Sequence, residues 1–184
     1  MKRVELPADI MVRVANREED AVRELYEATY KPLFAFLLSY THNYADAEDL
    51  LQETYMKVIG AAHLYQEQGN PMAWIMKIGK NQFLMQARKN QTQIVMESED
   101  VEACEDIPLD QISDVDTRIW MEQLFTCLTR EEQLIIILHT LMGFKHREIA
   151  QELDLPLGTV LTKYNRALKK LKNSEAMKGK EVRR

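Results

Sequence analysis

The chain has 184 residues, 46% of them hydrophobic, which is enough to bury a core in one domain or two small ones. No window approaches the roughly 20 apolar residues of a membrane span, and the acidic N-terminal segment is not a signal peptide, so we expect a cytoplasmic protein without direct membrane insertion. Cys104 and Cys127 lack CxxC spacing and the four histidines are scattered, so neither a metal site nor a cofactor is expected.

The net charge of −5 is divided unevenly along the chain. Residues 1–90 carry 11 Lys and Arg against 12 Asp and Glu, residues 91–117 carry no Lys or Arg against 9 Asp and Glu, and residues 118–184 carry 13 against 8. A mildly basic C-terminal unit is therefore separated from a near-neutral N-terminal unit by an acidic segment that contains Pro108 and no aromatic residue. We interpret residues 91–117 as a linker that is poorly ordered by itself.

The N-terminal part of the sequence predicts three helices. No alternating strand pattern occurs and glycines are few, so the whole chain is expected to be almost entirely helical. The first helix is expected to begin at residues 17–19 with Asn16 as its cap, and Pro32 is expected to bend or break it. The second is expected to begin at Asp46, whose side chain can cap it, and the third has Pro71 at its first position.

The second predicted helix has a polar, acidic face opposite its apolar positions, formed by Asp49, Gln52, Glu53 and Met56. Paired carboxylates can indicate catalysis or metal binding, but no ExxH motif occurs and no histidine lies one helical turn away. A solvated helix face is the usual explanation of such a strip. A protein-docking face is the more specific hypothesis.

The third predicted helix combines basic residues with an aromatic residue. Trp74, Ile78 and Met85 are expected to share its inward arc. Another arc carries the polar side chains of Lys77, Lys80, Asn81 and Arg88. Positive charge for the backbone and an aromatic face for a base suit single-stranded nucleic acid, although Trp74 also fits an ordinary core position.

Residues 145–171 are typical of two short amphipathic helices joined by a turn at residues 154–156. Asp154 tolerates positive φ in this turn, and Pro156 suits the first position of a helix that is expected to end near Leu171. The packed arc of this helix is expected to comprise Leu157, Val160, Tyr164, Ala167, Leu168 and Leu171. The opposite arc, suited to the phosphates and base edges of a DNA groove, comprises Thr159, Thr162, Lys163, Arg166, Lys169 and Lys170. An ordinary helical hairpin with a solvated lysine face would show the same pattern.

Three sequence patterns follow one another in order: DAEDLLQETYMKVI, then NPMAWIMKIGKNQFL, then, after the acidic segment, EIAQELDLPLGTV. Over about residues 16–171 this set resembles bacterial sigma factors of the extracytoplasmic-function (ECF) group, sigma-70 relatives with only regions 2 and 4. The resemblance implies an all-α fold with two small helical domains. These would be a region 2 bundle at residues 1–90 and a region 4 helix-turn-helix domain at residues 118–172, joined by the acidic linker and followed by a basic, frayed tail at residues 173–184.

The resemblance also implies a function without catalytic activity: binding to core RNA polymerase, promoter recognition and help in melting the DNA. The clamp helices of the largest polymerase subunit would be contacted by Asp49, Gln52, Glu53 and Met56, and the region 4 part would contact the flap. The minus-ten element and the non-template strand would be held by Trp74, Lys77, Lys80, Asn81 and Arg88. The minus-35 element would be read or anchored chiefly by Thr159, Lys163 and Arg166. An anti-sigma factor is an expected further partner.

Several positions depart from the family pattern. Met85 and Gln86 stand where an Asp-Arg pair is usual, Leu161 replaces a basic residue, and Lys163 and Tyr164 replace Arg-Leu. These changes leave the promoter sequence open, and the smaller number of charges could weaken melting.

Two other classes of function fit parts of the pattern. A stand-alone helix-turn-helix regulator would bind palindromic sites as a dimer and would need no polymerase-docking face. A degenerate sigma-like protein would bind polymerase without melting a promoter. An enzyme ranks last, because the sequence offers no constellation of nucleophile, base or metal ligands.

Overall fold

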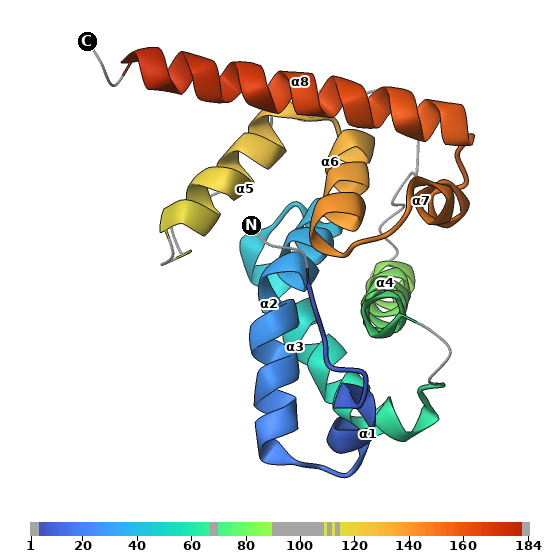
Figure 1. Cartoon of the computed structure of the whole chain (residues 1–184). Helices are drawn as coiled ribbons and strands as arrows, with labels where there is room; N and C mark the ends of the chain where they lie inside the picture. The colour runs from blue at the N-terminus through green and yellow to red at the C-terminus, as the bar shows by residue number, and fades with distance from the viewer. Residues whose placement is uncertain (1–3, 67–69, 90–108, 110–111, 113–114, 182–184) are drawn as a thin grey trace. The chain divides into compact units, whose positions relative to one another are not determined.

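The computed structural model describes residues 4–66, 70–89, 109, 112 and 115–181, and their regular elements are all helices, which confirms the all-α expectation (Figure 1). These residues fall into two compact units, one formed by the described residues up to 89 and the other by those from 109 onward. Most of the acidic segment at residues 91–117 lies outside the described residues. None of the described helices has the length and apolar character that crossing a membrane requires.

The N-terminal unit contains α1 (Ile10–Ala15), α2 (Glu19–Thr41), α3 (Tyr44–Ala61), the 3-10 helix η1 (Ala62–Leu64) and α4 (Pro71–Lys89). Helices α2, α3 and α4 pack against one another pairwise, and α1 contacts α2, α3 and η1. The apolar side chains enclosed between them are almost completely buried: Leu25, Leu33, Leu37, Leu38, Leu50, Met72 and Ile75. Their spacing along each helix follows the 3.6-residue period, which is why the helices form amphipathic faces that meet.

The start of α2 differs from the expectation. Asn16 is the C-cap of α1 and does not cap α2, and Arg17 follows it in the left-handed region with φ of 62°. Helix α2 begins at Glu19, preceded by Glu18 in an extended conformation. The sequence pattern does not predict α1, which forms because its apolar side chains reach the core: Ile10, Met11 and Val14.

Pro32 does not interrupt α2, so the expected break at this position is wrong. Pro32 itself and residues 33–38 after it are buried. An internal proline costs a helix about 3 kcal/mol, and the burial of this apolar run is large enough to outweigh that cost.

The other two helix starts lie close to the predicted positions. Helix α3 begins at Tyr44 rather than Asp46, because the side chain of Asn43 accepts a hydrogen bond from the backbone N–H of Asp46 at 3.1 Å and so caps the helix earlier. Helix α4 begins at Pro71 as expected, and Asn70 Oδ1 accepts a hydrogen bond from the backbone N–H of Met72, the second residue of the helix, at 2.9 Å.

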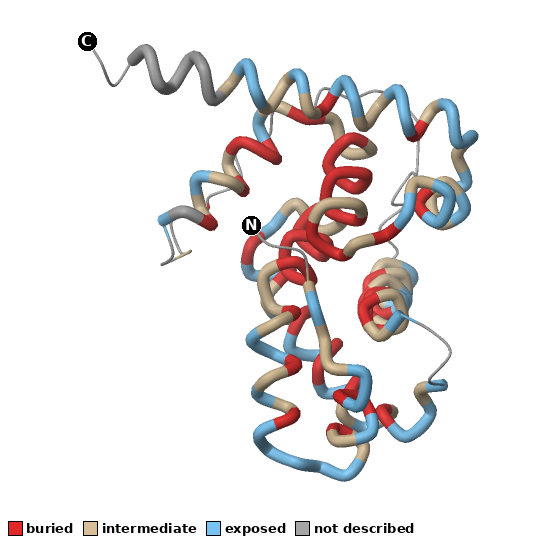
Figure 2. The backbone as a smooth tube through the Cα atoms, viewed as in Figure 1, coloured by how far each residue is buried: buried red, intermediate tan, exposed pale blue. Residues whose placement is uncertain are grey.

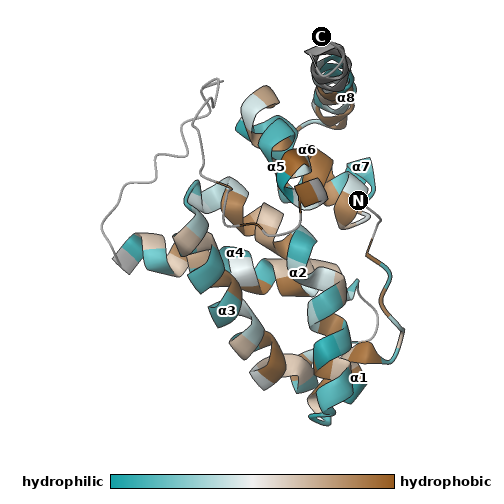
Figure 3. Cartoon of the chain, turned by 90° about the vertical axis from the view of Figure 1, so that its left-hand side faces the viewer, coloured by the Kyte–Doolittle hydropathy of each residue, from teal (hydrophilic) through white to brown (hydrophobic). Residues whose placement is uncertain are grey.

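The C-terminal unit contains α5 (Val115–Cys127), α6 (Arg130–Ile136), the π-helical segment η2 (Ile137–Leu141), α7 (His146–Glu152) and α8 (Leu157–Glu181). Helix α8 contacts α5, α6 and α7, and runs across the ends of α5 and α6 (Figure 1). Helix α6 and the start of η2 form the centre of the unit: residues 132–138 are buried (Figure 2), and the apolar run at residues 134–138 gives this segment its hydrophobic colour (Figure 3).

The turn between α7 and α8 is formed as expected, with Asp154 at φ of 53°. The carbonyl of Pro156 accepts the first hydrogen bonds of α8, from the N–H groups of Thr159 and Val160. Helix α8 continues to Glu181, ten residues beyond the predicted end at Leu171. The expectation of a frayed tail is therefore wrong for the backbone of residues 173–181, where Lys, Glu, Ala and Met have high helix propensity.

Candidate protein-docking and nucleic-acid interfaces

The polar face predicted on α3 is exposed. Asp49, Gln52, Glu53 and Met56 are all exposed, and the Met56 side chain is 74% accessible. The opposite face of α3 packs into the N-terminal unit. We refer to these four residues as the α3 surface. It consists of one long apolar side chain surrounded by polar and acidic ones, an arrangement that suits a protein contact with an apolar centre and a polar rim.

One end of the α3 surface is attached to α4. The carboxylate of Glu53 accepts hydrogen bonds from Gln82 Nε2 at 3.3 Å and from Gln86 Nε2 at 2.9 Å. The ammonium group of Lys57, also on α3, donates a hydrogen bond to Gln82 Oε1 on α4. Gln86, one of the departures from the family pattern, therefore has a structural role: it holds Glu53 in place.

A cluster of tyrosine rings stiffens the pairing of α2 with α3, and the sequence analysis did not identify it. The Tyr26 ring lies 5.3 Å from that of Tyr30 and 4.9 Å from that of Tyr55. The Tyr55 hydroxyl is 2.7 Å from Thr29 Oγ1, and burial raises the pKa of Tyr55. Burial, with Glu48 nearby, raises the pKa of Tyr44 to about 12. The Tyr44 hydroxyl donates to Glu48 Oε1 within α3 at 3.1 Å, whereas the hydrogen bond between Tyr55 and Thr29 joins α3 to α2.

The expected arcs of α4 are partly wrong. Met85 was expected to face inward, but its side chain is 59% exposed. The physical reason is the close approach at Gly79, where a Cβ would lie 3.1 Å from Leu37 Cδ2 and 3.3 Å from Thr54 Oγ1. This approach turns Gly79 inward, and Met85, six residues later, then points about 120° away from it. The inward arc is formed by Met72, Ile75, Met76, Gly79, Gln82 and Phe83.

The outward side of α4 keeps most of the predicted polar side chains. Lys77, Asn81 and Arg88 are exposed, whereas Lys80 is half-buried. Trp74 is also half-buried, and its ring meets that of Tyr65 edge to face with centroids 5.7 Å apart. Trp74 is therefore neither a core residue nor a freely exposed one. Part of its side chain packs, and part remains accessible next to the polar, outward side of α4.

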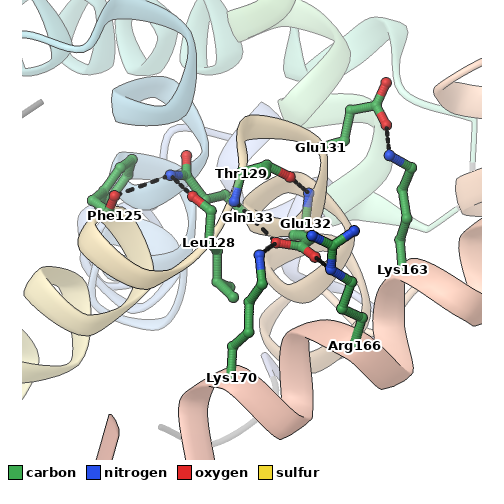
Figure 4. Close-up of polar contacts among 9 residues, drawn as sticks. All are labelled: Phe125, Leu128, Thr129, Glu131, Glu132, Gln133, Lys163, Arg166 and Lys170. Carbon is green, nitrogen blue, oxygen red and sulfur yellow. Dashed lines mark hydrogen bonds and ion pairs between the residues drawn. The ribbon is translucent and has the colours of Figure 1, made fainter. Parts of the chain in front are cut away.

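The cationic arc predicted on α8 is divided by the fold. Lys163 Nζ lies 2.8 Å from Glu131 Oε2 of α6, and Lys170 Nζ lies 2.7 Å from Glu132 Oε2 (Figure 4). Arg166 Nε lies 3.4 Å from the other carboxylate oxygen of Glu132, with 65% of its side chain still exposed. Lys163 and Lys170 therefore face α6, which corrects the expectation that both point outward.

Helix α8 is rotated relative to the prediction because its packed seam follows the small residues Val160 and Ala167, both fully buried. Leu157 and Leu161, in contrast, are exposed. A pattern based on hydropathy places lysine in solvent, but a long lysine side chain can lie along a seam when a neighbouring helix offers a carboxylate. Within residues 157–174, the part of α8 whose burial the structure describes, the exposed side chains are those of Leu157, Leu161, Thr162, Asn165, Arg166, Lys169, Lys172 and Asn173, while Thr159 is half-buried.

Three aromatic rings join η2, α7 and α8. The sequence did not indicate this cluster, because its two histidines are separated along the chain. The rings of His139 and His146 are 4.1 Å apart, and each meets the Tyr164 ring at 4.8 Å. His139 Nδ1 is hydrogen-bonded to the carbonyl of Phe144 at 2.8 Å. Burial, and secondarily the neighbouring His139, lower the pKa of His146. This cluster fixes α7 against α8.

No group of three or more His, Cys, Asp or Glu side chains in the described part of the chain could hold a metal ion. Cys127 carries a free thiol, and Cys104 lies outside the described residues. The exposed polar surfaces of the described helices include the α3 surface, the outward side of α4 and the outward side of α8.

Two family models match the chain. The Sigma-70 region 2 family model matches residues 25–93 and the Sigma-70 region 4 model matches residues 118–171, together more than half of the chain. The ECF RNA polymerase sigma factor SigX of Bacillus subtilis (strain 168) is 25% identical over 162 residues, covering 84% of this chain and 83% of SigX.

Two solved structures resemble the fold. The sigma factor RpoE in complex with the anti-sigma factor NepR, from Bartonella quintana, matches with a TM-score of 0.55 and 25% identity over 82% of this chain and 94% of that one. CnrH in complex with the cytosolic domain of CnrY matches with a TM-score of 0.55 over 93% of this chain and 99% of that one, at 18% identity, which shows a shared fold.

Proposed function

The chain belongs to the sigma-70 family, in its ECF group, and is an RNA polymerase sigma factor; from this we propose which of its surfaces bind core polymerase and which bind promoter DNA. Sigma factors of this family bind core polymerase and promoter DNA and are not enzymes. The observation that carries the assignment is the presence of both sigma regions, in order, on a chain whose candidate surfaces remain exposed. Residues 1–90 then form the region 2-like domain and residues 118–172 the region 4-like domain.

The α3 surface is the proposed docking site for the clamp helices of the largest polymerase subunit. Its support is physical: Met56 offers an apolar anchor, and Asp49 and Gln52 form a polar border around it. Glu53 contributes as well, held in position by Gln82 and Gln86. A second contact, between the region 4-like domain and the flap, accompanies it.

The outward side of α4 is the proposed contact to the minus-ten element and to the melted non-template strand. Lys77, Asn81 and Arg88 supply charge and hydrogen-bond donors, and Trp74 and the exposed Met85 offer apolar surface to a base. Lys80, half-buried, lies at the edge of this surface. The departures at Met85 and Gln86 reduce the number of charged side chains on this surface. Gln86, however, has a role within the fold, because it holds Glu53 in place.

The outward side of α8 is the proposed reader of the minus-35 element in the major groove. The side chains suited to base edges and to thymine methyl groups are Thr162, Asn165 and Leu161, and those suited to phosphates are Arg166 and Lys169. This set shares Thr162, Arg166 and Lys169 with the sequence-based one, and it adds Asn165 and Leu161, which the packing of α8 turns outward. Thr159, half-buried, lies at its border.

Regulation by an anti-sigma factor is part of the proposal. The resemblance to RpoE, whose structure was solved in complex with NepR, supports a partner of this kind. A protein that acts on cytoplasmic polymerase and DNA would itself be cytoplasmic.

Reconstitution with core polymerase tests the proposed function. The purified chain plus core is expected to give promoter-dependent run-off transcripts. Asp49→Lys combined with Met56→Ala is expected to abolish co-purification with core, because it removes both the charge and the apolar anchor of the α3 surface. Glu27→Lys, an exposed charge reversal on α2, is the control and should leave binding unchanged.

Two results would contradict the proposal. A dimer that protects a palindromic duplex in the absence of polymerase would indicate a stand-alone regulator. Binding to core without open-complex formation would indicate a sigma-like protein that does not initiate transcription.

A further inference from the structure

Glu132 is a carboxylate fixed within α6, with only 2% of its side chain exposed. Its Oε2 accepts a hydrogen bond from the backbone N–H of Thr129 at 3.0 Å, and Thr129 Oγ1 accepts one from the N–H of Glu132 at 3.5 Å. The neighbouring Gln133 amide donates to the Leu128 carbonyl at 2.9 Å and so ties this turn to the end of α5 (Figure 4). This reciprocal capping box orients the carboxylate without any contribution from α8.

Two cations of α8 converge on this carboxylate. Lys170 binds one oxygen at 2.7 Å and Arg166 binds the other at 3.4 Å (Figure 4). Residues 166 and 170 are about one turn apart on the same side of the helix. Binding both of them to one fixed group therefore determines the rotation of α8 about its axis and its position along that axis. A rotation by one residue, about 100°, would break both contacts.

The apolar part of the contact between α6 and α8 determines this rotation less strictly. On α8 it includes the small side chains of Val160 and Ala167, both fully buried. Apolar burial is non-directional, whereas charge-assisted hydrogen bonds require one geometry. Because desolvation offsets most of what a buried ion pair contributes to stability, specifying a single arrangement is its better-supported role.

We propose that Glu132 is a positioning residue for promoter recognition: by holding Arg166 and Lys170 it determines which face of α8 meets the minus-35 element. This inference rests on the proposed function. Lys170, and Lys163 through Glu131, are then structural cations that do not contact DNA. Arg166 has two roles. Glu132 binds its Nε, and this contact orders the guanidinium group, whose other N–H groups can donate to a DNA phosphate.

Selection of DNA by the holoenzyme tests this inference. Duplexes randomised over the upstream and downstream promoter elements are selected with core polymerase plus the full chain, and the wild type is expected to enrich one motif at each element. Glu132→Gln keeps the size of the side chain and removes its charge. We expect this variant to retain the minus-ten motif, while its preference for the minus-35 motif over a scrambled element falls about tenfold, the effect of losing one base contact.

Two further variants separate positioning from charge and from unfolding. Glu122→Gln makes the same charge change on α5 and should leave the preference intact. Glu132→Asp keeps the charge and a capping carboxylate but shortens the side chain by one methylene, so it is expected to fold and still to lose the minus-35 preference. Removing a negative charge strengthens binding to every duplex. If Glu132→Gln strengthens binding to motif and scrambled DNA equally, the inference is overturned.

The salt dependence of DNA binding provides an independent readout. Lys169→Ala is expected to lower the slope of log affinity against log salt by about 0.9, the value for one phosphate contact, whereas Lys170→Ala should leave the slope unchanged. An equal change in both variants would overturn the structural role of Lys170. Full minus-35 preference in both Glu132 variants would overturn the inference alone, whereas a wild-type chain that selects no motif would refute the proposed function as well.

Discussion

The two helices that carry the candidate surfaces, α3 and α8, relate differently to their own sequence patterns. On α3 the polar arc predicted from the sequence is the exposed arc of the folded unit. On α8 the predicted cationic arc is divided, because Lys163 and Lys170 are bound by Glu131 and Glu132. The difference shows that helical periodicity indicates the packed side of a helix only approximately. It misplaces long cations where a neighbouring helix presents a carboxylate, and it misplaces apolar side chains such as Leu157 and Met85 where tertiary packing turns them outward.

The largest expected effect comes from removing the carboxylate that orients α8. Glu132→Ala should lower the free energy of unfolding of the C-terminal unit by about 3 kcal/mol, at the low end for a broken buried pair because Arg166 and Lys170 keep access to water. Glu131→Ala breaks a pair that is only partly buried and should cost at most about 1 kcal/mol. Urea unfolding followed by Trp120 fluorescence in a Trp74→Phe background measures this unit. Equal losses in the two variants would remove the distinction between Glu131 and Glu132.

An intermediate effect is expected in the N-terminal unit at Gly79. Gly79→Val should destabilise this unit by about 2 kcal/mol, because the added side chain meets Leu37 and Thr54 at distances where a Cβ is already tight. Gly60→Ala on α3 is the control: outside the adjoining residues and the backbone of its own helix, no heavy atom lies within 4 Å of the added Cβ, and the variant should gain about 0.5–1 kcal/mol from helix propensity. Urea unfolding followed by Trp74 fluorescence in a Trp120→Phe background distinguishes the two. Tolerance of Gly79→Val would show that α4 is not held by this close approach.

The smallest expected effect is a dependence on pH confined to the C-terminal unit. The pKa of His146 is lowered from the ordinary 6.5 by burial and by His139, so the unfolded chain takes up a proton before the folded one as the pH falls. Stability should therefore be fully present above about pH 6.5 and decrease below it. Thermal unfolding between pH 5 and 7.5, followed by the same Trp120 fluorescence, measures the decrease. His146→Gln should flatten the profile, whereas His63→Gln, at an exposed position of the other unit, should not. A profile unchanged by His146→Gln would exclude this histidine as the cause.

Much of the candidate site could be predicted from the sequence because it depends on local features. The start of α4 at Pro71, the positive φ of Asp154 and the exposed α3 surface depend on side chains within one or two turns of one another. The errors arise where tertiary contacts decide. Pro32 stays within α2 because its surroundings are buried, and Met85 is exposed because Gly79 turns α4 towards Leu37 and Thr54. The ring cluster of His139, His146 and Tyr164 joins residues that are separated in the sequence.

The sequence by itself determined the all-helical class and the exposed polar face of α3, since propensities, turn residues and the 3.6-residue period are properties of short segments. The resemblance of its three ordered motifs to known sigma factors indicated the two sigma regions. The tertiary structure alone decided how α8 is rotated about its axis, and therefore which of its side chains face outward. The physical reason is that the rotation of a helix depends on its partners: here Val160 and Ala167 pack in the seam, and the carboxylate of Glu132, fixed on a different helix, binds Arg166 and Lys170.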